Sequence, residues 1–146
     1  MTKLSLVLLQ LDVVFGDPKA NRQNVSEWFA KANLQPNEFV LLPELWDTGY
    51  DLTRLPEIAD REGKTAQAFL AGLAKQYQVF ISGGSIARQV ADKVFNTTYV
   101  VAPTGEILTR YDKVHLFRLM EEEKFLHAGN QLAQTNIADF SVAPFI

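Results

Sequence analysis

The sequence predicts an α/β fold in which a mixed β-sheet is covered on one face by helices. Three observations predict it. Short apolar runs typical of buried strands alternate with stretches of helical period, the helices recur at a spacing of roughly 30 residues, and a later β-rich pair is joined by a tight turn. With 146 residues, we expect one domain, residues 1–146, with a core of its own.

Three apolar runs in the first part of the chain predict strands. Residues 4–11 are apolar between polar flanks and predict a buried strand, and residues 38–42 predict a second strand that ends at Pro43. Residues 79–81 predict a third. The stretch 43–56 between the second strand and the next helix is expected to be a loop, although it contains large side chains.

Two helices are predicted between these strands. The first is expected to begin at Asp17-Pro18, because aspartate caps free amides and proline has no N–H to leave unpaired, and to end near Asn33. The second follows Gly63. The apolar residues expected on their inner faces are Val25, Trp28, Phe29 and Ala32 in the first helix, and Ala66, Phe69, Leu70, Leu73, Ala74 and Tyr77 in the second.

The second half of the chain predicts a hairpin, a long loop and a final strand. Residues 94–101 and 106–111 are β-rich, and the Pro-Gly link 102–105 between them favours a turn. A polar stretch runs over 118–136. The apolar run 140–146 predicts a strand, and because the sequence stops inside this run, we expect the natural chain to continue.

The composition is that of an ordinary globular protein, with 47% apolar residues, 21% charged residues and a net charge of −3. Basic residues do not cluster, which argues against a nucleic-acid partner. The apolar start is too short to span a bilayer and has no signal-peptide cleavage site, so we expect a cytoplasmic protein without a membrane partner. The sequence contains no cysteine, which excludes disulfides within it.

Glu44 is the first candidate for chemistry. It follows directly on a predicted strand, and ligands meet α/β sheets at strand ends. Its neighbours Pro43, Leu45 and Trp46 would partly desolvate the carboxylate, as a general base requires. The alternative is a carboxylate that only caps a turn or pairs on the surface, since structural carboxylates outnumber catalytic ones.

Lys113 is the second candidate. In the segment 111–117, alternation along an extended chain would place Lys113, His115 and Phe117 on one face. A lysine and a histidine at a strand end could stabilise a developing oxyanion. The alternative is a lysine at a sheet edge whose ammonium simply reaches water.

Other chemistries find little support in the sequence. The acidic run 121–123 lies between the only two histidines without any HExxH-like spacing, so we expect no metal site. Gly83-Gly84 is too short for a phosphate loop, and Ser82 and Ser85 lack the G-x-S-x-G pattern of serine hydrolases. We therefore expect neither a cofactor nor a serine nucleophile.

Taken together, these segments resemble one family, the carbon–nitrogen hydrolases of the nitrilase superfamily. The likeness extends over the whole chain and includes two motifs in the right order. These are Leu41-Leu42-Pro43-Glu44-Leu45 followed by Thr48-Gly49-Tyr50, and Tyr111-Asp112-Lys113-Val114-His115-Leu116-Phe117, with Phe95-Asn96-Thr97 and Pro103-Thr104-Gly105-Glu106 between them.

The resemblance implies a set of catalytic residues. Glu44 would be the general base and Lys113 would stabilise the oxyanion. The family's second glutamate corresponds best to Glu122, with Glu121 and Glu123 as alternative registers. Within the two motifs, Tyr50 and His115 are the candidates for substrate binding. The family's nucleophilic cysteine would follow Ile146, and the sequence as it stands has no nucleophile.

The resemblance also implies an αββα sandwich, incomplete in this chain, that pairs into homodimers. The implied reaction is hydrolysis of a small carboxamide with water, releasing ammonia through a cysteine thioester. Arg118-Leu119-Met120, the acidic run and Ala128-Gly129 look most like the omega-amidase branch, which acts on monoamides of 2-oxo dicarboxylic acids. The alternative is a non-catalytic binding or regulatory module that retains the fold.

Overall fold

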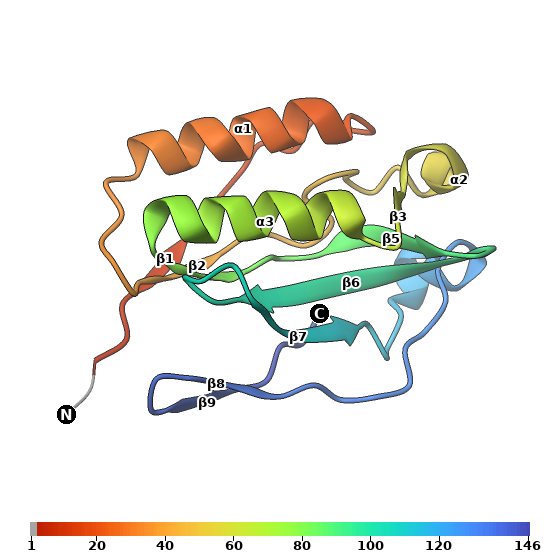
Figure 1. Ribbon diagram of the computed structural model, residues 1–146. Helices are drawn as coiled ribbons and strands as arrows, with labels where there is room; N and C mark the ends of the chain where they lie inside the picture. The colour runs from red at the N-terminus through yellow and green to blue at the C-terminus, as the bar shows by residue number, and fades with distance from the viewer. Residues whose placement is uncertain (1–2) are drawn as a thin grey trace.

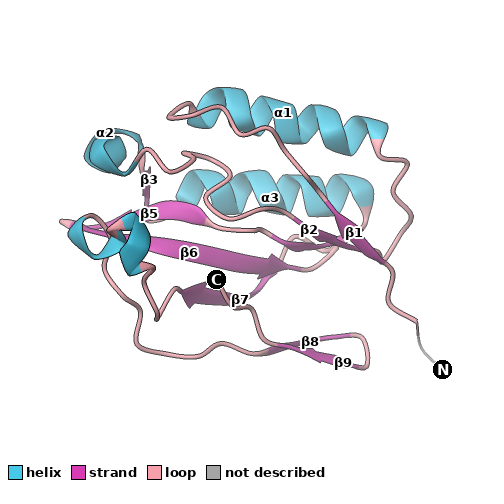
Figure 2. Ribbon diagram, turned by 180° about the vertical axis from the view of Figure 1, so that it is seen from behind, coloured by secondary structure: helices cyan, strands magenta, loops and turns pink. Residues whose placement is uncertain are grey.

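The computed structural model describes residues 3–146 and has three layers. Helices α1 (Pro18–Lys31) and α3 (Lys64–Tyr77) lie on one face of a seven-stranded sheet, and a small two-stranded sheet lies below the other face (Figure 1). Figure 2 shows the same order of layers from behind. The predicted α/β class, with helices on one face of the large sheet, is confirmed.

The large sheet is mixed, with the strand order β1-β2-β4-β6-β5-β3 and β7 paired to β6. The pairs β1–β2, β2–β4 and β3–β5 are parallel, and β6 is antiparallel to β4, β5 and β7. The strands are β1 (Leu6–Leu8), β2 (Phe39–Leu41), β3 (Asp60–Arg61), β4 (Phe80–Ser82), β5 (Ile86–Val90), β6 (Lys93–Val101) and β7 (Ile107–Asp112).

The main core lies between the helices and the large sheet. The carboxylate of Asp17 accepts from the Ala20 amide at 2.9 Å, as expected of an N-cap, and Val25 and Phe29 of α1 are buried. Four residues of the predicted inner face of α3 are buried: Ala66, Leu70, Leu73 and Ala74. No helix in the described part, residues 3–146, has the length and apolar character needed to cross a bilayer.

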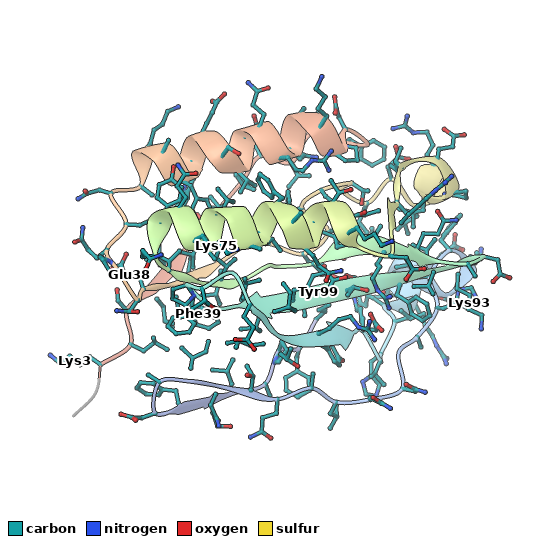
Figure 3. The ribbon with its side chains drawn as sticks, viewed as in Figure 1. Lys3, Glu38, Phe39, Lys75, Lys93 and Tyr99 are labelled. Carbon is teal, nitrogen blue, oxygen red and sulfur yellow. The ribbon has the colours of Figure 1, made fainter. Side chains whose placement is uncertain are left out.

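A second, smaller core lies on the opposite face of the sheet. There Phe39 and Val100 pack with Ile137 from the hairpin of β8 (Thr135–Ile137) and β9 (Phe140–Val142). Figure 3 shows Phe39 and Tyr99 between the layers, whereas Lys75 and Lys93 are exposed. The sheet is therefore buried on both faces over its centre, which explains the apolar runs of β2 and β6.

Several predicted elements differ from the structure. The run 4–11 contains only the three-residue edge strand β1, whose Leu6 and Leu8 are 59% and 68% exposed, because only the face that carries Val7 meets the helices. The expected loop 43–56 contains the short helices η1 (Leu52–Arg54) and α2 (Leu55–Ile58). Strand β5 was not predicted.

The end of the chain also differs from the prediction. In the run 140–146 only Phe140–Val142 forms a strand, and it pairs with β8 and not with the large sheet. Residues 143–146 have no strand pairing. The polar stretch 118–136 contains two 3-10 turns, η2 (Arg118–Met120) and η3 (Glu122–Lys124).

Candidate active site

Glu44 lies just beyond β2, in a loop that is fixed by the loop after the neighbouring parallel strand β4. The backbone of Ser85 donates to the Pro43 carbonyl at 3.1 Å, and the Ser85 hydroxyl accepts from the Leu45 amide at 2.9 Å. The Trp46 indole donates to the Gly83 carbonyl at 2.8 Å. Because β2 and β4 are parallel, their carboxyl ends meet at one edge of the sheet, as the sequence predicted for Glu44.

Gly84 allows these two loops to approach each other closely. Its φ is +56°, and a Cβ at this position would lie 2.0 Å from the Pro43 carbonyl oxygen. Only glycine combines this backbone conformation with so close a contact. Glu44 is thus carried by a turn held on both sides, and its side chain is 35% exposed.

Lys113 lies directly after β7 and is almost fully buried, at 5% exposed. Its amide donates to the Asn96 carbonyl at 2.8 Å, and its own carbonyl accepts from Gly129 at 2.8 Å. Its Nζ donates to Glu44 Oε1 at 2.8 Å and to Glu122 Oε1 at 3.1 Å. The structure therefore brings the three predicted residues Glu44, Lys113 and Glu122 together.

Burial distinguishes the three candidates for the second glutamate. Glu122 is 0% exposed, and its Oε2 also accepts from the Phe117 amide at 2.7 Å. Glu121 instead has an exposed side chain that pairs with Lys124, and Glu123 is exposed. The positive φ of Glu121, +55°, starts η3 and turns Glu122 inward.

The charges at the site perturb its titratable groups. Burial alone would lower the pKa of the Lys113 ammonium, but its hydrogen bonds and ion pairs with Glu44 and Glu122 outweigh burial and raise it. The Tyr50 hydroxyl is next to the same two carboxylates. Burial, together with their negative charge and hydrogen bonding, raises the pKa of Tyr50 above its ordinary value. Lys113 stays charged, and Tyr50 stays a neutral donor at the edge of the pair.

His115 does not share the face of Lys113. The segment after β7 is not extended, so the predicted alternation is wrong: Lys113 is buried, and His115 is exposed. His115 lines a separate surface depression with Leu116, Arg118 and Glu123. The structure thus places Tyr50, but not His115, against the carboxylates.

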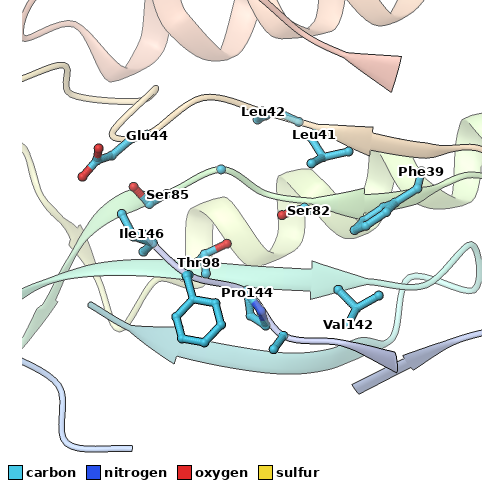
Figure 4. Close-up of a pocket in the computed structure, with 13 residues that line it drawn as sticks. Phe39, Leu41, Leu42, Glu44, Ser82, Ser85, Thr98, Val142, Pro144 and Ile146 are labelled. Carbon is cyan, nitrogen blue, oxygen red and sulfur yellow. The ribbon is translucent and has the colours of Figure 1, made fainter. Parts of the chain in front are cut away.

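A cavity of about 430 Å³ adjoins Glu44. Its walls include Leu42, Ser85 and the end of the chain at Ile146, whose side chain lies near Ser85 in Figure 4. A substrate in this cavity would meet the exposed part of the Glu44 carboxylate. Glu44 and the chain end at Ile146 therefore line the same cavity, and Lys113 reaches it through its ion pair with Glu44.

One residue at the site was not assigned a role from the sequence. Asn96 of β6 is 0% exposed, and its Nδ2 donates to Glu44 Oε1 at 2.8 Å. The available signal was a short polar side chain in a strand otherwise rich in β-branched and aromatic residues, where asparagine is unfavourable. Periodicity does not indicate what such a residue contacts.

Known proteins resemble this chain in sequence. A sequence model described as carbon–nitrogen hydrolase matches residues 6–144. The chain is 40% identical over 129 residues to the 2-oxoglutaramate amidase of Bacillus subtilis (strain 168), covering 88% of this chain and 49% of the relative. It is 29% identical over 138 residues to human omega-amidase NIT2, covering 90% and 49%.

A solved structure has the same fold. It is XC1258 of Xanthomonas campestris, described as a CN-hydrolase superfamily protein with an arsenic adduct in its active site. The TM-score is 0.90 at 25% identity, over 99% of this chain and 53% of that one. The chain spans about half the length of the curated relatives it matches. The match to residues 6–144 shows that the chain belongs to the carbon–nitrogen hydrolase family of the nitrilase superfamily.

Proposed function

We propose that the complete protein hydrolyses the C–N bond of a small carboxamide and releases ammonia through a cysteine thioester. The observation that carries the proposal is the Lys113 ammonium held between Glu44 and Glu122 at 2.8 and 3.1 Å, beside a cavity. The relatives named as amidases support the reaction class.

The first half-reaction needs a base and an oxyanion partner. Glu44 takes the thiol proton, the sulfur bonds to the amide carbon, and the oxyanion forms next to Lys113. The lysine has three N–H donors, of which Glu44 and Glu122 occupy two, so the third can meet the oxyanion. The proton then passes to the leaving nitrogen, the C–N bond breaks and ammonia departs.

The second half-reaction reuses the same groups. Glu44 takes a proton from water, the hydroxide oxygen bonds to the thioester carbon, and the C–S bond breaks to give the free acid and the thiol. The sequence contains no cysteine. We propose that the thiol follows Ile146, which lines the same cavity as Glu44.

The proposed substrate is a monoamide of a 2-oxo dicarboxylic acid. The names of two relatives, 2-oxoglutaramate amidase and omega-amidase, favour this class. Tyr50, next to both carboxylates, is proposed to contact the substrate amide. The homodimeric state and the cytoplasmic location stay predictions, which sedimentation and cell fractionation would test.

The test is ammonia release by the complete gene product. A monoamide of a 2-oxo dicarboxylic acid is compared with a neutral aliphatic amide of equal length. We expect faster ammonia release from the 2-oxo acid monoamide. Glu44→Gln and Lys113→Ala should each lower kcat by at least about 100-fold, because each removes a group that acts in the transition state. Full activity in both variants would refute the assignment of the site.

The alternative is a non-catalytic binding or regulatory module with the same fold. It predicts that the complete gene product has no cysteine after Ile146 and releases no ammonia from any amide, while still binding one. An intact-mass measurement with a thiol-specific label distinguishes the two proposals.

A further inference from the structure

Asn96 is linked to both halves of the Glu44–Lys113 pair. Its side-chain Nδ2 donates to Glu44 Oε1 at 2.8 Å, and its backbone carbonyl accepts from the Lys113 amide at 2.8 Å. It lies on β6, which pairs with three other strands, and it is 0% exposed. A single residue on the most constrained strand thus fixes the two charged groups relative to each other.

The other half of this amide is unsatisfied. Asn96 Oδ1 is buried and has no hydrogen-bond partner among the described residues. A buried acceptor without a partner is unfavourable, and an apolar side chain of the same size would avoid it. Fold stability therefore does not explain an asparagine here, whereas its donation to Glu44 does.

We propose that Asn96 is a positioning residue for the general base. Glu44 Oε1 accepts from both Asn96 Nδ2 and Lys113 Nζ. Two donors from different parts of the chain therefore fix the orientation of the carboxylate. Asn96 keeps the Glu44 carboxylate directed at the cavity. This inference deepens the proposed function and rests on it.

The first test is Asn96→Leu in the complete gene product. Leucine has a similar size and no donor. We expect kcat to fall by about 10- to 100-fold, the range expected for a lost hydrogen bond to a charged group, with KM changed by less than about threefold. A merely structural role would instead lower the melting temperature and leave kcat of the folded protein unchanged.

The second test is Asn96→Asp, whose effect should depend on pH. Ionised, the introduced carboxylate repels Glu44; protonated, its O–H can donate to Glu44 Oε1 as the amide did. Activity relative to wild type should therefore rise as the pH falls for Asn96→Asp, whereas it should stay low at every pH for Asn96→Leu. A ratio that does not change with pH for Asn96→Asp would contradict the inference.

Asn21→Leu is the matched control. Asn21 is also a buried asparagine, at 1% exposed, and its amide donates to the carbonyls of Val14 and Asp47 at 2.7 Å, outside the charged site. We expect a lower melting temperature with wild-type kcat in the folded protein. Identical behaviour of the two leucine variants would overturn the inference.

An additional measurement separates this inference from the proposed function. A crystal structure of Asn96→Leu shows the Glu44 carboxylate without any turnover, and we expect the carboxylate to turn away from the orientation in which its Oε1 accepts from Asn96 Nδ2 at 2.8 Å. If the wild type released no ammonia, the proposed function would fail, and the orientation of this carboxylate would still test Asn96. An unchanged orientation would overturn the inference whether or not the protein is an active amidase.

Discussion

Replacing Glu122 by glutamine tests the buried charge triad directly. The carboxylate accepts from Lys113 Nζ at 3.1 Å through Oε1 and from the Phe117 amide at 2.7 Å through Oε2. Glutamine has one acceptor oxygen and one NH₂ group. Whichever way it turns, one of these donors loses its acceptor and faces another donor.

The expected cost of Glu122→Gln follows from these contacts. A hydrogen bond to a charged group contributes about 1.5–3 kcal/mol, and breaking a fully buried ion pair costs about 3–5 kcal/mol when the remaining charge is left alone. Lys113 keeps Glu44 as a partner, so we expect a smaller cost than for a lone buried charge, about 2–3 kcal/mol of unfolding free energy.

The assay is urea unfolding of the complete gene product, with Glu121→Gln as the matched control. Glu121→Gln is the same substitution one residue earlier. The Glu121 side chain is 60% exposed and pairs with the exposed Lys124, so we expect no measurable loss of unfolding free energy. In a Lys113→Met background, the cost of Glu122→Gln should shrink, because the ion pair is already gone. Equal losses for the two glutamine variants would refute the reasoning.

Three further predictions concern stability and self-association. Burial raises the pKa of Asp47 to about 7 from its ordinary 3.8. The folded protein is therefore fully stabilised by protonated Asp47 below pH 3.8, and its unfolding free energy falls by up to about 1.4 kcal/mol per pH unit as the pH rises toward 7. Asp47→Asn should remove this loss. Urea midpoints of the wild type and of Asp47→Asn that change with pH in the same way between about pH 5 and 8 would contradict this prediction. Gly84→Ala should destabilise by more than about 1 kcal/mol and lower kcat, because its Cβ would collide with the Pro43 carbonyl; wild-type values for both would contradict this. Residues 1–146 expressed alone should self-associate through exposed apolar side chains such as Leu8 and Phe145, at 68% and 69% exposed, and a monomer by sedimentation would count against it.

The sequence identified the features that depend on neighbouring residues. The helix start at Asp17-Pro18, the apolar face of α3 and the β6–β7 hairpin follow from local capping, periodicity and turn chemistry, and all three are found. The sequence also placed Glu44 and Lys113 at strand ends. Strand ends of one sheet edge meet in space, so their approach to 2.8 Å was predictable.

Only the tertiary structure decided which side chains reach the site. Three adjacent glutamates look alike in sequence, and it is the positive φ of Glu121 and the hydrogen bond from the Phe117 amide that hold Glu122 inward. His115 was predicted to face the same way as Lys113, but the chain leaves the extended conformation after β7 and His115 is exposed. Asn96 received no role because it lies inside a strand and not at a strand end, and the pattern of a strand does not indicate which residue its amide contacts. Such contacts depend on how strands and loops pack across the sheet, and local sequence patterns carry no record of that packing.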